Sequence, residues 1–175
     1  MTSKGMRLVS SAALAAILAI FSELPASAIY YSGGMPSATF SIKPWNYNST
    51  WQSPLNSALA SWNATATPAN IAKSTSATAT LTVSSTSDTW YGLYTPTGIW
   101  PFRSFTIKLN SRRIGADASN LSNFIKSAFA HEIGHGLSLG DNPTTSSSSL
   151  MKHNRDRNTL YLPQSYDIAE VNAYY

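Results

Sequence analysis

The 175-residue sequence contains no cysteine, which excludes a disulfide framework and any thiolate ligand for a metal. Charged residues are also few, at 11% of the chain, and the formal net charge is only +4. Because these charges are scattered and form no basic stripe, we expect no nucleic-acid partner. Apolar runs are short as well, since the longest one, at residues 8–21, is below the ~20 residues that span a bilayer.

The first 28 residues have the pattern of a secretory signal peptide. A positively charged start precedes the apolar run at 8–21, and the small residues Ala-Ser-Ala at 26–28 offer a cleavage site. We therefore predict a signal peptide at 1–28 and a single domain at 29–175, which is long enough for one hydrophobic core. The predicted location is outside the cell, with no membrane contact after cleavage.

The segment with the clearest chemistry is residues 131–141, which read HEIGHGLSLGD. On a helix, His131 and His135 lie on the same face one turn apart, so both imidazoles can reach a single metal ion. Glu132 projects close to the same point without being needed as a ligand, and its carboxylate could take a proton from a zinc-bound water. Asp141 follows where a third ligand, here an oxygen, would complete a zinc site.

Residues 131–141 resemble the extended signature of metzincin-clan zinc metalloproteases, H-E-x-x-H-x-x-G-x-x-H or D. Ser138 stands at the turn glycine of that signature. Asp141 stands where most members have histidine. An aspartate at this position resembles the snapalysin family of small secreted bacterial proteases. Residues 149–151, Ser-Leu-Met, resemble the Met-turn beneath the metal, and residues 162–168 resemble the start of the last matrixin helix. Over its C-terminal half the sequence therefore resembles a matrixin-like metzincin.

The resemblance implies a secreted zinc-dependent metalloendopeptidase. One catalytic Zn²⁺ would be bound by His131, His135 and Asp141. Glu132 would act as the general base, and Met151 would form a packed floor under the histidines. The substrate would be a protein or peptide, and the enzyme would act as a monomer. Matrixins commonly carry a propeptide cysteine that blocks the zinc. Since this chain has no cysteine, any inhibition would come from a separate inhibitor protein.

The implied fold class is α/β (α+β), zincin-like. It has a twisted, mostly parallel five-stranded sheet, two long helices, and a small C-terminal subdomain with the Met-turn and a final helix. Apolar periodicity predicts strands at 38–43, 69–73, 77–83, 90–94 and 102–109. It also predicts a helix from residue 49, a long helix capped by Asp117 or Ser119, and a closing helix at 167–175.

The strand predicted at 90–94 would lie at the edge of the sheet, along the cleft. Its free backbone groups could bind an extended peptide. The alternative is an ordinary edge strand whose aromatic side chains are packed.

Three interpretations of His153 stay open. It lies two residues after Met151, where the astacins and serralysins place a tyrosine, and it could donate a hydrogen bond to a developing oxyanion. It could also replace Asp141 as the third zinc ligand. The third interpretation is a solvent-facing histidine within the polar run Lys-His-Asn-Arg at 152–155.

Two other functions also stay open. The chain could be a secreted zinc-binding protein without protease activity, in which Ser138 and Asp141 mark the loss of an active site. The presence of Glu132 argues against this, because a structural zinc site has no use for a base. The chain could instead be a zinc hydrolase of non-protein amide bonds, although the predicted edge strand favours a peptide substrate.

Overall fold

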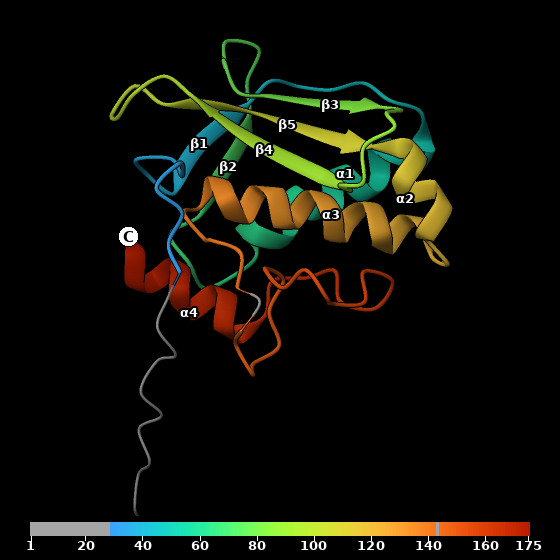
Figure 1. Ribbon diagram of the computed structural model, residues 1–175. Coiled ribbons are helices and arrows are strands. Elements are labelled where there is room, and N and C mark those ends of the chain that lie inside the picture. The colour runs from blue at the N-terminus through green and yellow to red at the C-terminus, as the bar shows by residue number, and fades with distance from the viewer. Residues whose placement is uncertain (1–28, 143) are drawn as a thin grey trace, which may run out of the picture.

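The computed structural model describes residues 29–142 and 144–175 (Figure 1). The signal peptide predicted at 1–28 lies outside the described residues. Along the described chain the elements are β1 (Thr39–Ile42), α1 (Ser49–Asn63), β2 (Asn70–Lys73), β3 (Thr80–Ser84), β4 (Gly92–Thr97), β5 (Ser104–Asn110), α2 (Ser111–Asp117), α3 (Leu121–Gly136) and α4 (Ser165–Tyr174). In this part of the chain no helix is long and apolar enough to cross a membrane.

The described residues form a mixed α/β domain with four helices and two small sheets. β1 pairs in parallel with β2, while the second sheet has the order β3-β5-β4, with β3 parallel and β4 antiparallel to β5. The predicted strands are confirmed, but the predicted single five-stranded sheet is wrong. β1 ends at Ile42, which pairs with Ala79 just before β3 begins. A single isolated β-bridge therefore joins the two sheets, and β1 and β3 do not form a continuous ladder of backbone hydrogen bonds.

The central strand β5 shows why this sheet has one buried face. Successive side chains of a strand point to opposite faces, and Phe105, Ile107 and Leu109 are fully or almost fully buried, while Lys108 between them is exposed. The apolar face rests on α3, which runs beneath the strands in Figure 1. β4 extends through Pro96 to Thr97, beyond the end predicted at residue 94. An edge strand tolerates this proline because its missing N–H is not needed for pairing on the open side.

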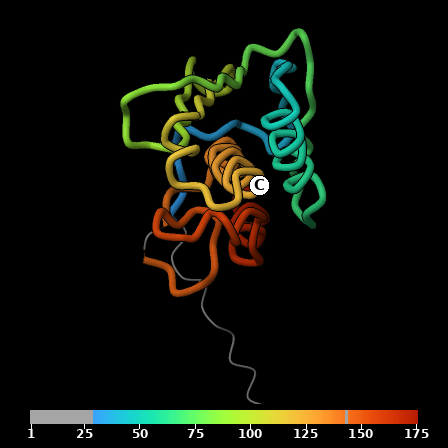
Figure 2. The backbone as a smooth tube through the Cα atoms, turned by 90° about the vertical axis from the view of Figure 1, so that its right-hand side faces the viewer, coloured from blue at the N-terminus to red at the C-terminus, as the bar shows by residue number. Residues whose placement is uncertain are grey.

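The helix α3 lies at the centre of the domain. In Figures 1 and 2 the strands lie on one side of it and the C-terminal segment with α4 on the other, and α1 runs beside it. α1 and α3 make the largest helix–helix contact among the described elements, with Leu55, Ala58 and Trp62 buried. The indole Nε1 of Trp62 donates to the carbonyl of Ala130 at 2.8 Å. The position of α3 is therefore fixed from all sides.

The segment before α3 differs from its prediction. Residues 111–117 form the short helix α2, which sequence periodicity did not show, and α3 is capped by Asn120 instead of Asp117 or Ser119. The side chain of Asn120 accepts from the Asn123 amide at 3.1 Å. Asn158 accepts from the backbone amides of Ser119 and Asn120, at 3.0 and 2.9 Å. This long-range contact, absent from any local pattern, selects the cap.

Candidate metal centre

The turn that ends α3 prepares the site. The amide of Leu139 donates to the Gly134 carbonyl at 2.9 Å and the amide of Ser138 to the His135 carbonyl at 3.1 Å, which is the Schellman arrangement. Ser138 takes the left-handed position with φ 64°, where the sequence comparison expected a glycine. Its Oγ contacts the Tyr175 Oη at 2.9 Å. This tertiary contact holds a serine in a conformation that favours glycine.

The N-terminal segment fixes the chain after that turn. The carbonyls of Ser138 and Ile29 accept from the amides of Tyr31 and Gly140, at 2.8 and 2.7 Å. A Cβ at Gly140 would lie 2.6 Å from the Ile29 carbonyl oxygen, so no larger residue fits. The close pairing leads the chain back over the end of α3 and carries Asp141 to the histidines.

Both helix histidines are oriented by backbone carbonyls. The Nδ1 of His131 lies 2.9 Å from the Leu150 oxygen, and the Nδ1 of His135 lies 2.8 Å from the Leu139 oxygen. A carbonyl oxygen only accepts, so each Nδ1 carries the proton and donates it. Each Nε2 is then left with a lone pair that faces the cleft. Histidines that bind a metal through one ring nitrogen typically donate the N–H of the other to a carbonyl or carboxylate, as these two do.

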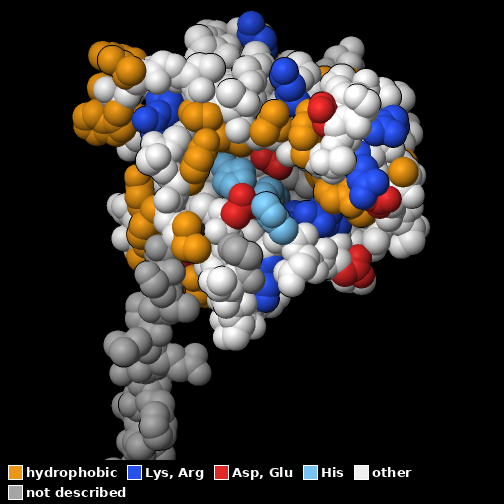
Figure 3. All heavy atoms as spheres, viewed as in Figure 1, with side chains coloured by type: hydrophobic (Ala, Val, Ile, Leu, Met, Phe, Trp, Pro, Cys, Tyr) orange, Lys and Arg blue, Asp and Glu red, His pale blue; other side chains and the backbone are white. Residues whose placement is uncertain are grey.

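The carboxylate of Asp141 completes the cluster. Its Oδ1 lies 3.3 Å from His131 Nε2 and 3.7 Å from His135 Nε2. The ligand atoms of the three residues all lie within 4.8 Å of one another. In Figure 3 the histidine side chains lie in a hollow, with acidic side chains next to them. The sequence named these three residues, and the fold brings them together.

This donor set fits a zinc ion. Ligands about 2.1 Å from tetrahedral zinc are ~3.4 Å apart, close to the 3.3 and 3.7 Å between Asp141 and the histidines. Two lone pairs that face a carboxylate oxygen at this distance repel it unless a cation or proton lies between them. Moreover, Asp141 Oδ1 is buried without a partner of hydrogen-bond geometry in the described part of the chain. A bound cation would satisfy it.

The protonation states also suit a metal. Burial lowers the pKa of His131 to about 3 and lowers the pKa of His135 as well. Both imidazoles are therefore neutral near pH 7, the form that binds metal. Burial opposes the ionisation of Asp141, but the surrounding histidines together hold its pKa well below the usual range. At neutral pH the cluster thus offers two neutral nitrogens and one negative oxygen.

Glu132 lies in the wall of the same cleft. It is buried, and burial raises its pKa to about 8 although the positive charge of Arg155 opposes the shift. A cation at the neighbouring cluster would favour the ionised form. Its carboxylate lies against the backbone of Gly92, the first residue of β4. Strand and helix together therefore hold the one carboxylate of the cleft that is not a ligand.

The turn at Met151 (residues 149–152) supports the histidines from below. The Sδ of Met151 lies so close to Gly134 that an added Cβ would be 2.5 Å away. The carboxylate of Asp167 holds this turn, since it accepts from the Ser149 hydroxyl at 2.6 Å and from the Leu150 amide at 2.8 Å. The Leu150 carbonyl in turn accepts from His131. Asp167 in α4 is therefore linked to the metal cluster through a single residue, Leu150.

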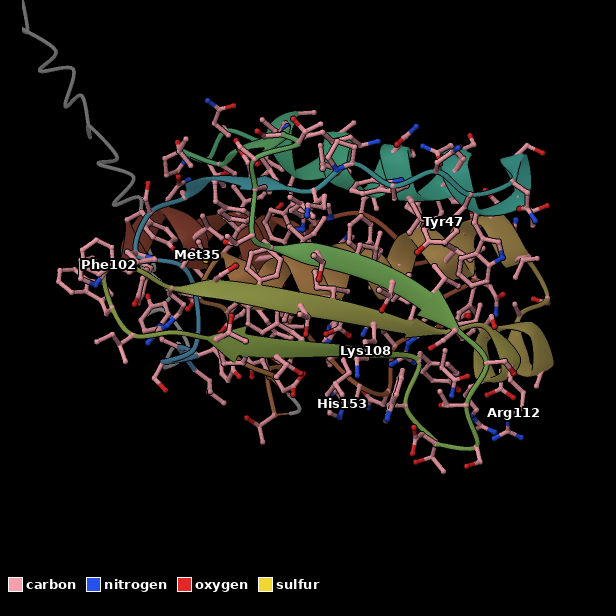
Figure 4. All side chains as sticks on the ribbon, turned by 90° about the horizontal axis from the view of Figure 1, so that it is seen from above. Met35, Tyr47, Phe102, Lys108, Arg112 and His153 are labelled. Carbon is pink, nitrogen blue, oxygen red and sulfur yellow. The ribbon has the colours of Figure 1, made fainter. Side chains whose placement is uncertain are left out.

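His153 lies at the cluster without belonging to the group of three ligands, His131, His135 and Asp141. Its side chain is 66% exposed, and its Nε2 lies 2.8 Å from Asp141 Oδ1. In the view from above it lies beyond the outer edge of β4 (Figure 4). The solvent-facing interpretation is thus incomplete, because the side chain both faces solvent and contacts the cluster.

Comparisons with known proteins give little similarity. No family model matches the sequence, and no curated protein matches it. Among solved structures, the chain is similar to a chain of the GM1-bound form of the ECX AB5 holotoxin. The TM-score is 0.49 at 14% sequence identity, covering 82% of this chain and 80% of that chain.

The predicted membership of the metzincin clan, as a matrixin-like protein, is therefore wrong. No family model of a protease matches the sequence. The physical reason lies in the size of the motif. A pattern of about ten residues determines where two imidazoles and a carboxylate lie on one helix and its following turn, and such short patterns recur in unrelated chains.

Sequence reasoning missed three residues of the site. In the sequence, Gly92 stands only within the strand predicted at 90–94, Asp167 only within the predicted closing helix, and Arg155 only within the polar run at 152–155. Arg155 is in fact buried, at 8% exposure, and lines the cleft together with Arg157. Only the lone acidic residue at the start of the last helix gave a signal, since an N3 aspartate is typical of a capping box.

Proposed function

We propose that the protein is a secreted zinc-dependent metalloendopeptidase. The observation that carries the proposal is the convergence on Asp141 Oδ1: this buried oxygen atom lies 3.3 and 3.7 Å from the Nε2 atoms of His131 and His135, and none of its contacts among the described residues has the geometry of a hydrogen bond. His131, His135 and Asp141 would hold the ion. Glu132 lies beside them in the same cleft.

Bound zinc would polarise a carbonyl group and make a water molecule more acidic. The residues of the chain supply the proton transfer and a hydrogen-bond donor. Glu132 accepts a proton from the attacking water and passes it to the nitrogen of the leaving amine. Glu132 is part of α3, and β4 covers its side chain. This burial excludes competing water and holds the carboxylate at one position. His153, whose Nε2 lies 2.8 Å from Asp141 Oδ1, would turn to donate a hydrogen bond to the reacting oxygen.

The cleft and its edge strand suit a peptide substrate. The cleft has a volume of about 560 Å³, and residues 89–94, which run into β4, form one of its walls. β4 pairs only with β5 among the described strands. In Figure 4 it is the outermost strand of its sheet. An extended peptide can add to such an edge through backbone hydrogen bonds, which places its carbonyl groups along the cleft.

The test measures zinc content and hydrolysis of casein for the purified protein and for Glu132→Gln. We expect one zinc per chain in both, and cleavage by the parent alone, with a loss of at least ~10²-fold in the variant. Asp88→Asn, an exposed change outside the cleft, serves as the matched control and should cleave at the parental rate. Zinc binding without cleavage by the parent would contradict the proposal and favour a zinc-binding protein or a hydrolase of non-protein amides.

A further inference from the structure

The cleft has two chemically different ends along α3. The metal end holds His131, His135, Asp141 and Glu132. The other end, which we call the basic end, is lined by Thr89, Trp90, Tyr91, Ala128, Arg155 and Arg157. Figure 3 shows basic side chains next to the histidines in the same hollow. Both arginines line the basic end, whereas none of the acidic residues that the structure describes does.

Arg155 is held by neutral groups only. Its Nη1 donates to the Lys152 carbonyl at 2.6 Å, and its Nε and Nη2 donate to the hydroxyl and carbonyl of Ser127, each at 3.2 Å. Among the described residues it forms no ion pair. A guanidinium has five N–H groups, so two of them stay available. A buried charge without a partner is costly, and a bound anion would lower that cost.

Arg157 is held by aromatic rings. Its guanidinium carbon lies 4.5 Å from the centre of the Tyr91 ring and 6.0 Å from that of Phe124. Within the described chain it forms no ion pair. Stacking on rings fixes the plane of a guanidinium while its N–H groups remain free to bind a carboxylate in a bidentate manner. The head group of Arg157 is therefore oriented in advance.

The charges of the cleft do not cancel once a divalent cation is bound. The negative charges of Asp141 and Glu132 balance the two positive charges of the ion. Arg155 and Arg157 then remain as two positive charges without a counter-charge in the cleft lining, since Asp167 and Asp117 act on them only from outside it. An anionic group of the substrate would supply it.

We propose that the basic end binds a carboxylate of the substrate next to the bond that is cut, with Arg157 as the direct partner and Arg155 as the buried charge behind it. This inference rests on the proposed endopeptidase function. The carboxylate has two sources in a peptide, namely the side chain of Asp or Glu and the free C-terminus. Both have the planar geometry that a guanidinium binds.

The first measurement is binding. Zinc-loaded Glu132→Gln is titrated by calorimetry with peptide pairs that differ in a single group. One pair has Glu against Gln at a position beside the scissile bond, and the other has a free C-terminus against an amide. We expect about tenfold tighter binding of the charged member in one pair, as charge-assisted hydrogen bonds provide. The pair that shows the difference identifies the source of the carboxylate.

Two arginine variants test the assignment. Arg157→Gln in the same background should abolish the preference. Arg113→Gln should leave it unchanged, because Arg113 lies near the same Tyr91 ring, at 5.6 Å, but does not line the cleft. A preference that survives in Arg157→Gln would come from another positive charge of the cleft and would overturn the assignment of Arg157 as the direct partner. Equal binding of both members in both pairs would overturn it as well.

The second measurement is cleavage by the zinc-loaded parent. The charged peptide should show a kcat/KM about tenfold higher than its neutral partner, and 1 M salt should reduce this ratio because of screening. Cleavage at equal rates, independent of charge, would overturn the carboxylate assignment while the endopeptidase function stands. If no peptide is cleaved, the endopeptidase function fails, and the binding titration alone decides whether the basic end takes a carboxylate.

Discussion

The backbone of Gly92 lies directly against the carboxylate of Glu132. A Cβ added at this glycine would come within 2.7 Å of Glu132 Cδ, and closer still to the carboxylate oxygen Oε1. The backbone φ is not positive at this position, so the requirement is for space alone. Glycine is thus needed here so that β4 can approach α3 and leave room for the buried acid.

Gly92→Ala should therefore impair turnover without removing the metal. The methyl group must displace either Glu132 or the start of β4, and a misplacement of about 1 Å costs on the order of 10²-fold in rate. Overpacking also costs about 1–3 kcal/mol of stability. Peptide hydrolysis, zinc content and urea unfolding measure the three effects. The matched control is Gly115→Ala, where the added Cβ meets nothing within 4 Å. Parental turnover in Gly92→Ala would contradict the role of this contact.

Zinc should stabilise the protein, and Asp141→Asn should remove most of that effect. Ligand that binds only the folded state adds about 2.7 kcal/mol at a concentration of 100 Kd. The amide loses the negative oxygen that faces both histidines, so zinc affinity should fall at least about tenfold. The metal-free variant should stay within about 1 kcal/mol of the metal-free parent, because the short contact that it loses is with the largely exposed His153, and exposed pairs contribute little. Thermal unfolding with and without zinc decides the matter, and an undiminished zinc effect would exclude Asp141 as a ligand.

His153→Phe should keep the metal and slow the reaction. The group of three ligands does not include His153, so we expect one zinc per chain. Loss of a donor to the developing charge typically costs ~10²-fold in kcat. Metal analysis together with kinetics separates the three interpretations. Loss of zinc would make His153 a ligand, and full zinc at the parental rate would make it a surface residue.

The left-handed Ser138 should tolerate glycine but no branched side chain. In Ser138→Gly the relief of backbone strain offsets the lost contact with the Tyr175 hydroxyl, so stability should stay within about 1 kcal/mol. Ser138→Val should lose about 2 kcal/mol or more, because β-branched residues rarely adopt positive φ. Urea denaturation gives both values. Equal stability of the two variants would show that the turn relaxes to another conformation.

Asp167→Asn should weaken the metal site from a distance. The carboxylate is buried and accepts from Ser149, Leu150 and Gln164. An amide replaces one acceptor oxygen by a donor: its remaining oxygen can still accept from the Leu150 and Gln164 amides, but the Ser149 hydroxyl loses its acceptor and the bonds lose their charge, which costs about 1–3 kcal/mol. The displaced turn no longer holds His131, so zinc affinity should fall together with stability. Unfolding and zinc titration are measured in parallel, with exposed Asp88→Asn as the control. Unchanged zinc affinity would mean that the turn does not transmit the change.

The sequence alone determined the local elements of this domain. Two histidines four residues apart on a helix must share a face, and alternating apolar residues such as Phe105, Ile107 and Leu109 must share the buried side of a strand. These relationships depend only on the geometry of the backbone, so the positions of the strands, of α3 and of the histidine pair could be read from the chain. Family membership could not, because the motif that suggested it is itself local.

The tertiary structure decided the contacts that join distant segments. Asn158 selects the cap of α3, Tyr175 holds Ser138 at positive φ, and Asp167 positions the turn that orients His131. The single bridge between Ile42 and Ala79 divides the strands into two sheets. Arg155 changes from a surface charge in the sequence to a buried one in the cleft only because Ser127, 28 residues away, accepts its hydrogen bonds. Such partners are determined by packing in three dimensions, which the spacing of residues along the chain does not predict.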